Sequence, residues 1–157
     1  MNFFYYTKWF DLHFRKLAAE GYDEVKNWNA KVDLFHYDMI LVPIHLPDHW
    51  TLVVIQVKNK TIKYYDSLKG RGNAVLLNLE QYMFKEHLAR KKPLRGKYKR
   101  ETATDNPTQS ASSLDCGLFV SVYAEHISRN APLAFDQIDM RYYRYKVAYE
   151  ILKYKLM

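Results

Sequence analysis

Uninterrupted apolar runs, rather than strict alternation, mark the first half of this 157-residue chain. Residues 39–46 form one such run, which is typical of a buried strand even though Pro43 lies within it. Two runs rich in β-branched residues follow at 51–57 and 61–65, and only residues 58–60 separate them. Two strands joined by so short a connection predict a β-hairpin.

This hairpin would bring a histidine and an aspartate to the same end of the sheet. His49 lies at the start of one strand and Asp66 at the end of the next. If residues 59–60 form a two-residue turn, Asp66 pairs with Val53, and His49 is four residues further along on the same face. At about 3.3 Å per residue the two would not touch in a flat ladder. A twist, a bulge or a bend at residues 48–49 would have to close the gap.

Two long segments in the second half have the periodicity of helices. The first is predicted over residues 73–89, and its core-facing positions would be Val75, Leu76, Leu79, Tyr82 and Met83. The second is predicted over roughly residues 136–156. Its apolar stripe has alternating spacings of four and three, which we interpret as core packing. The stripe consists of Ile138, Tyr142, Tyr145, Tyr149, Leu152 and Leu156.

The N-terminal region is crowded with aromatic residues between positions 3 and 18. Residues 22–28 predict a short helix with Val25 and Trp28 facing inward. Because the chain begins so abruptly in core-like sequence, we expect further sequence to precede it. We therefore expect residues 1–157 to be a single domain in a fragmentary or reduced form.

Composition narrows the class of protein. With 48% hydrophobic and 16% aromatic residues, the chain can bury a real core as one domain. Its single cysteine excludes an internal disulfide framework and a Cys-x-x-Cys zinc site, and favours a reducing compartment. The apolar runs are too short to span a bilayer, and the N-terminus lacks the basic start of a signal peptide. We expect a soluble, intracellular protein of the nucleus or cytoplasm.

The net charge of +7 comes largely from basic residues between positions 90 and 100. A solvated loop is the simplest interpretation. A nucleic-acid contact is a second, but no DNA- or RNA-binding motif accompanies the charge. A third is attraction to an acidic protein surface.

The single cysteine, Cys116, lies where a polar loop becomes an apolar-periodic segment that begins near Leu114. Ser112 or Ser113 is a natural N-cap for the predicted helix. Cys116 then lies in the first turn, where unpaired N–H groups and the helix dipole favour a reactive thiolate. The alternative is that Cys116 is a small buried hydrophobic residue.

A thiol nucleophile needs a base, a carboxylate that orients the base, and donors for the oxyanion. His49, Asp66 and Gln109 are the candidates, although each alone is weak evidence. His45 is interpreted as a core or edge histidine and His126 as lying on the exposed side of a helix. No histidine and carboxylate spacing indicates a metal site.

Taken together, these motifs resemble the SENP/Ulp family of SUMO-specific cysteine proteases. The resemblance extends from the first residues through Leu156 and includes separated motifs in the family's order. They are residues 42–45, His49-Trp50 and the strand that follows, Tyr65-Asp66-Ser67, Gln109, Asp115-Cys116-Gly117 and residues 149–152.

The resemblance implies an α+β, papain-like fold of the Ulp/adenain type, with a central mixed sheet flanked by helices. It makes Cys116 the nucleophile, His49 the general base, Asp66 its orienting residue and Gln109 an oxyanion donor. Trp50 would cover the Gly-Gly tail of the substrate. The implied protein is a monomeric thiol protease or isopeptidase for SUMO or a similar ubiquitin-like modifier. It would need no cofactor and no metal.

The chain departs from the family pattern in two places. Gln109 lies seven residues before Cys116 rather than six, an offset that resembles the adenovirus-type proteases. In the family, the Gly-Gly tail lies in a narrow tunnel, and an N-terminal segment with a Trp-Leu-Asn-Asp-like motif supplies the wall opposite the tryptophan that Trp50 matches. Residues 1–157 do not contain this motif. Two alternatives therefore stay open. One is a catalytically weak module that binds the modifier, and the other is a related thiol enzyme that acts on another tail.

Overall fold

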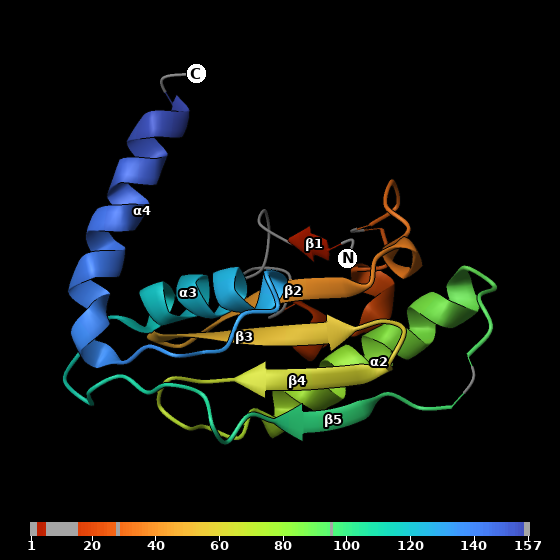
Figure 1. Ribbon diagram of the computed structural model, residues 1–157. Coiled ribbons are helices and arrows are strands. Elements are labelled where there is room, and N and C mark those ends of the chain that lie inside the picture. The colour runs from red at the N-terminus through yellow and green to blue at the C-terminus, as the bar shows by residue number, and fades with distance from the viewer. Residues whose placement is uncertain (1–2, 6–15, 28, 95, 156–157) are drawn as a thin grey trace.

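A five-stranded mixed sheet is the centre of the protein (Figure 1). The computed structural model describes residues 3–5, 16–27, 29–94 and 96–155. The strands lie side by side in sequence order: β1 (Phe3–Tyr5), β2 (Met39–Leu46), β3 (His49–Gln56), β4 (Thr61–Tyr65) and β5 (Lys99–Thr102). The three central strands are antiparallel, whereas β1 pairs with β2 and β5 with β4 in parallel.

Helices cover both faces of the sheet. Helix α2 (Asn73–Ala89) packs on one face and α3 (Cys116–Ser128) on the other, whereas α4 (Met140–Lys155) contacts α3 and extends away from the sheet (Figure 1). The described residues also include three short 3₁₀ helices, η1 (Tyr22–Glu24), η2 (Leu34–His36) and η3 (Gln137–Asp139), and residues 16–20 are helical. Among the described residues, no helix combines the length and apolarity needed to cross a membrane.

The uninterrupted apolar run of β2 follows from this two-sided covering. Ile40, Val42 and Ile44 pack in the core under α2. Met39 and Leu41 pack in the second core under α3. Because successive side chains point to opposite faces, a strand buried on both faces is apolar throughout. The predicted strands at 39–46 and 61–65 are confirmed, and β3 begins two residues earlier than predicted, at His49.

The predicted register of the hairpin is wrong by two residues. Gln56 pairs with Thr61 and Leu52 with Tyr65, so four residues form the turn rather than two. The cause is Val57, whose N–H donates to the carbonyl of Asp38 at 3.0 Å instead of extending the hairpin ladder. Continued by one residue, the observed register places Asp66 opposite Thr51, only two residues from His49.

The predicted packing of the C-terminal stripe is also wrong. Ile138, Tyr142, Tyr145, Tyr149 and Leu152 are between 62% and 83% exposed. Leu156 lies outside the described residues. The helix turns Met140 and Tyr143 toward α3 instead, in the core cluster that contains Phe135. The periodicity predicted the helix but not the face that it buries.

Three smaller predictions need correction. The segment predicted as a helix over 22–28 contains only η1, although Val25 is buried as expected and Trp28 lies outside the described residues. The basic region predicted as a loop ends in strand β5. His126 is partly buried rather than on an exposed face, because its ring nitrogens bond to the Pro132 carbonyl at 2.7 Å and the Tyr143 hydroxyl at 3.1 Å.

Candidate active site

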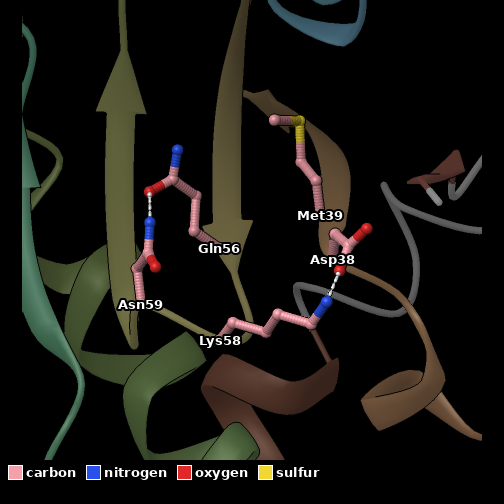
Figure 2. Close-up of a pocket in the computed structure, with 5 residues that line it drawn as sticks. All are labelled: Asp38, Met39, Gln56, Lys58 and Asn59. Carbon is pink, nitrogen blue, oxygen red and sulfur yellow. Dashed lines mark hydrogen bonds and ion pairs between the residues drawn. The ribbon is translucent and has the colours of Figure 1, made fainter. Parts of the chain in front are cut away.

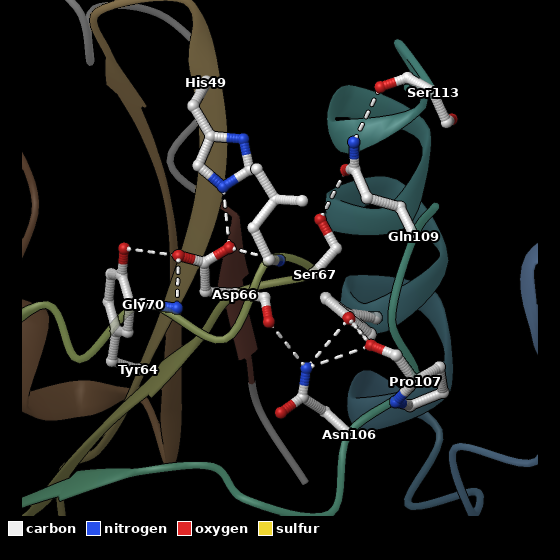
Figure 3. A network of polar contacts seen from close by, with 11 residues as sticks. His49, Tyr64, Asp66, Ser67, Gly70, Asn106, Pro107, Gln109 and Ser113 are labelled. Atoms are coloured by element: carbon white, nitrogen blue, oxygen red, sulfur yellow. Dashed lines mark hydrogen bonds and ion pairs between the residues drawn. The ribbon is translucent and has the colours of Figure 1, made fainter. Parts of the chain in front are cut away.

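His49 and Asp66 are in direct contact. His49 Nε2 lies 2.6 Å from Asp66 Oδ1 (Figure 3), and the Asp66 side chain is 5% exposed. Because this contact uses Nε2, Nδ1 is the ring nitrogen that can accept a proton from a nucleophile. The two-residue shift in register is what brings the pair within reach, since diagonal neighbours across a ladder can touch through long side chains.

Other donors fix the Asp66 carboxylate in place. The backbone N–H of Leu68 donates to Oδ1 at 2.7 Å, and that of Gly70 donates to Oδ2 at 3.1 Å. A Cβ at position 70 would lie 2.4 Å from Oδ2, so glycine permits this approach. The Tyr64 hydroxyl donates at 3.3 Å, and burial raises the pKa of Tyr64 to about 12, which keeps it a donor. The carboxylate is therefore held in one orientation toward His49.

Asn106 anchors the loop before α3 to the Asp66 end of the sheet. Its side-chain Nδ2 donates to the Asp66 carbonyl at 2.9 Å and lies 2.9 Å from the Tyr123 hydroxyl. Lys69 Nζ donates to the Asn106 carbonyl at 2.6 Å. Sequence reasoning missed this residue, and the only available signal was an Asn-Pro turn just before Gln109.

Gln109 is held between β4 and α3 (Figure 3). The Ser67 hydroxyl donates to Gln109 Oε1 at 2.7 Å, and the Gln109 backbone N–H donates to the Ser67 carbonyl at 3.0 Å. Its Nε2 donates to the Ser113 carbonyl at 2.8 Å. Because an amide nitrogen carries two hydrogens, one N–H of Gln109 can still serve a substrate oxygen.

Cys116 is the first residue of α3, as the sequence pattern predicted to within two residues. The predicted caps, Ser112 and Ser113, are wrong: the N-cap is Asp115, and its side chain makes no capping bond. The Ser113 hydroxyl donates to Asp115 instead, at 2.5 Å. The helical ladder starts with the Phe119 N–H on the Asp115 carbonyl at 2.9 Å. The first-turn N–H groups precede that ladder and can bind an anion.

Trp50 links the start of β3 to the first turn of α3. A Cβ added at Gly117 would lie 3.6 Å from the Trp50 ring. On its other side Trp50 stacks on His45, with ring centroids 4.4 Å apart, as expected for an edge histidine rather than a second base. The strand that carries His49 therefore meets the helix that begins with Cys116. The structure thus gathers the predicted residues at one end of the sheet.

Away from His49 and Cys116, the described residues form a pocket but no metal site. Among the described residues, no group of histidine, cysteine and carboxylate side chains can hold a metal ion. A pocket of about 360 Å³ is lined by Asp38, Met39, Gln56, Lys58 and Asn59 (Figure 2). It lies where β2 begins and β3 ends, the opposite end of these strands from His49. Lys58 and Asp38 in its wall are paired with each other at 2.5 Å.

Comparison with known proteins identifies relatives of this chain. Residues 1–156 match the model of the Ulp1 protease family, C-terminal catalytic domain. A sentrin-specific protease of Caenorhabditis elegans is 39% identical over 146 residues, which cover 92% of this chain and 21% of that protein. Sentrin-specific protease 2 of Homo sapiens is 38% identical over 146 residues, covering 90% and 25%. The chain thus spans about a fifth to a quarter of the length of these relatives.

A solved structure agrees with the sequence matches. The C-terminal Ulp1 protease domain in complex with Smt3, the yeast ortholog of SUMO, superposes with a TM-score of 0.83 at 31% identity. The match covers 99% of this chain and 70% of that one. The predicted α+β fold of the Ulp type is therefore confirmed. The chain belongs to the Ulp1 protease family of cysteine peptidases and matches its C-terminal catalytic domain.

Proposed function

We propose that this chain is a catalytic domain that cleaves after the Gly-Gly tail of SUMO or a similar ubiquitin-like modifier. Cys116 is the nucleophile, His49 the general base and Asp66 the residue that orients it. The observation that carries the proposal is the 2.6 Å contact between His49 and Asp66, beside the helix that begins with Cys116. A buried carboxylate bonded to an imidazole near a helix N-terminus is the arrangement that activates a thiol.

The reaction begins with proton transfer from the Cys116 thiol to His49. The sulfur attacks the carbonyl carbon of the last glycine, and the carbonyl oxygen becomes an oxyanion. The Gln109 amide and the first-turn N–H of Cys116 would donate to this oxygen. His49 then returns its proton to the leaving amine, so the carbon–nitrogen bond breaks and a thioester forms. Asp66 stabilises the imidazolium throughout.

Water completes the cycle. His49 takes a proton from the water as its oxygen attacks the thioester, and the carbon–sulfur bond breaks. The proton passes to the sulfur, which restores the Cys116 thiol and releases the modifier with a free carboxylate. Trp50, stacked on His45 and in contact with the Gly117 position, forms one wall over the tail. Only glycine residues leave room for an aromatic ring to lie against an extended backbone.

Mass spectrometry of the purified chain after incubation with a SUMO vinyl-sulfone probe tests the proposal. We expect one covalent adduct on Cys116, because it is the only cysteine. Cys116→Ala should abolish the adduct. His49→Ala should slow its formation by about 100-fold or more, since a positioned base contributes at least that much.

Two other results would contradict the proposal. A folded chain that binds SUMO without forming an adduct would be a binding module. A chain that reacts with a probe whose tail is not that of a ubiquitin-like modifier, but not with the SUMO probe, would be a thiol enzyme of different specificity. Circular dichroism of each variant checks that it is folded.

A further inference from the structure

Asp115, which directly precedes Cys116, is held by residues from the C-terminal part of the chain. Its Oδ2 accepts from Gln137 Nε2 at 2.7 Å and from the Ser113 hydroxyl at 2.5 Å. Its Oδ1 forms an ion pair with Arg144 of α4. These bonds, with that from Ser113 first among them, hold the pKa of Asp115 below its usual value. The Asp115 side chain is 11% exposed.

Gln137 connects this carboxylate to the loop that carries Gln109. While its Nε2 donates to Asp115, its Oε1 accepts from the backbone N–H of Ser110 at 2.8 Å. Ser110 directly follows Gln109. One side chain from η3 therefore fixes both ends of the segment between the proposed oxyanion donor and the nucleophile.

An aspartate at this position is a potential obstacle to thiol chemistry. A carboxylate at an N-cap normally accepts bonds from the first-turn N–H groups. Those are the groups that must bind the anionic sulfur or the oxyanion. An unpaired carboxylate beside Cys116 would also repel a thiolate, and its burial would limit screening by salt.

We propose that Arg144 and Gln137 are positioning residues for the nucleophile. They hold the Asp115 carboxylate away from the first turn of α3, and Arg144 cancels its charge. The inference rests on the proposed function, because it assigns these residues a role at the same site. The other titratable groups that the site contains are His49 on β3, the Asp66 carboxylate that it contacts, and the Tyr64 hydroxyl that donates to Asp66.

Alkylation of Cys116 by iodoacetamide, followed across a range of pH, tests the role of Arg144 without any substrate. Since the chain has one cysteine, the alkylation rate reports only Cys116. We expect Arg144→Ala to make alkylation at neutral pH about tenfold slower and to move the midpoint of the profile to higher pH. Arg144→Lys, which keeps the charge, should recover most of the rate.

A double variant separates charge from folding. In Asp115→Asn/Arg144→Ala the carboxylate at position 115 is gone, so no negative charge beside Cys116 needs to be cancelled. The pH profile of alkylation should therefore return toward that of the parent chain. Arg129→Ala is the matched control. It removes an arginine that pairs with Glu125 at 2.8 Å, at the opposite end of α3 from Cys116. It should leave the pH profile of alkylation unchanged. An unchanged midpoint in folded Arg144→Ala would overturn the inference, as would an equal shift in Arg129→Ala.

Gln137→Ala tests the second residue. It keeps the Arg144 pair but frees the Ser110 end of the loop, so capture of the SUMO probe should slow by about tenfold while the alkylation midpoint stays in place. Normal capture by folded Gln137→Ala would contradict its role. If the parent chain shows no SUMO capture but the Arg144 variants still shift the alkylation profile, the proposed function fails and the charge role of Arg144 stands.

Discussion

Helices α2 and α4 have similar lengths but opposite relations to the rest of the protein. In the 17-residue α2, all five residues predicted to face the core are buried, and each is at most 6% exposed. In the 16-residue α4, every described member of the predicted stripe is more than 60% exposed. Figure 1 shows the reason, since α2 lies along the sheet whereas α4 leaves it.

The difference teaches what periodicity can and cannot specify. Both helices carry apolar residues on more than one face: Leu77, Phe84 and Leu88 of α2 are exposed outside its buried stripe, and Met140 and Tyr143 lie beside the predicted stripe of the α4 region. The chain enters α4 from Phe135, which packs in the core under α3, and this entry decides which stripe is buried. The apolar pattern therefore indicates that a helix forms, whereas the face that the helix buries depends on where the preceding residues pack.

The largest expected difference in unfolding free energy is between removing a buried charge from α2 and removing an exposed charge from α4. Glu86 is 1% exposed and accepts bonds from the Tyr22 hydroxyl at 2.8 Å, Asn29 at 3.1 Å and Arg90 at 2.8 Å. Glu86→Ala should lower the free energy of unfolding by about 4 kcal/mol, because it removes the buried carboxylate that accepts these three bonds and takes from Arg90 its ion pair with Glu86. Urea denaturation followed by circular dichroism measures this.

Glu150 on α4 is the matched control. It is 46% exposed and lies 3.9 Å from Lys146, so Glu150→Ala should change the free energy of unfolding by less than about 0.5 kcal/mol. Equal effects of the two substitutions would contradict the contrast between the helices.

The next largest difference in unfolding free energy between α2 and α4 should come from shortening an apolar side chain on each helix. Met83 on α2 is fully buried, and Met83→Ala should cost about 3 kcal/mol of unfolding free energy through lost burial and an unfilled cavity. Leu152 on α4 is 62% exposed, and Leu152→Ala should cost less than about 0.5 kcal/mol. The same urea titration compares them, and a large loss in Leu152→Ala would show that α4 packs against something in solution.

The sequence predicted most of the fold where local pattern and packing agree. The bounds of β2, β4 and α2 follow from apolar runs and spacing, because both faces of the sheet are covered. Strand β5 was missed because Lys99-Arg100-Glu101-Thr102 has no apolar pattern. As an edge strand with charged side chains, it owes its place to backbone pairing with β4.

The candidate site was predicted residue by residue, but the contacts that fix it were not. The motif resemblance identified His49, Asp66, Cys116, Gln109 and Trp50, and their catalytic roles stay predictions. No local pattern pointed to Gln137 or Arg144, and the only signal at Asn106 was an Asn-Pro turn. Each acts through a contact with a residue distant in sequence, such as the 29 positions between Arg144 and Asp115. Such pairings depend on tertiary structure, which periodicity does not report.

A smaller effect on α2 depends on pH. His87 is 5% exposed, with its Nε2 3.3 Å from the Tyr98 hydroxyl and its ring 4.1 Å from that of Phe35. Burial lowers the pKa of His87 below the usual 6.5, although the Lys92 backbone opposes the shift and Lys60 adds to it. The unfolded chain therefore binds a proton at a higher pH than the folded chain does.

Stability should consequently fall as pH drops below about 6.5, by up to about 1.4 kcal/mol per pH unit until the folded-state pKa is reached. Above about pH 7.5 this contribution is constant. Urea titrations at several pH values, on the parent chain and on His87→Phe, measure it. The slope should flatten in His87→Phe, and an identical slope in both would assign the pH dependence to other groups.

The last comparison is between two tyrosines of α4 itself. Tyr149 is 64% exposed, whereas Tyr143 is partly buried, with its hydroxyl 3.1 Å from His126 Nε2 and its ring 5.8 Å from that of Phe135. Tyr143→Ala should therefore cost about 2 kcal/mol, and Tyr149→Ala less than about 0.5 kcal/mol. The two substitutions remove the same atoms from the same helix, so helix propensity cancels between them. A reversed order in urea denaturation would mean that the predicted stripe, not the observed one, faces the protein. Arg144 would then point elsewhere, and the inferred hold on Asp115 would fall with it.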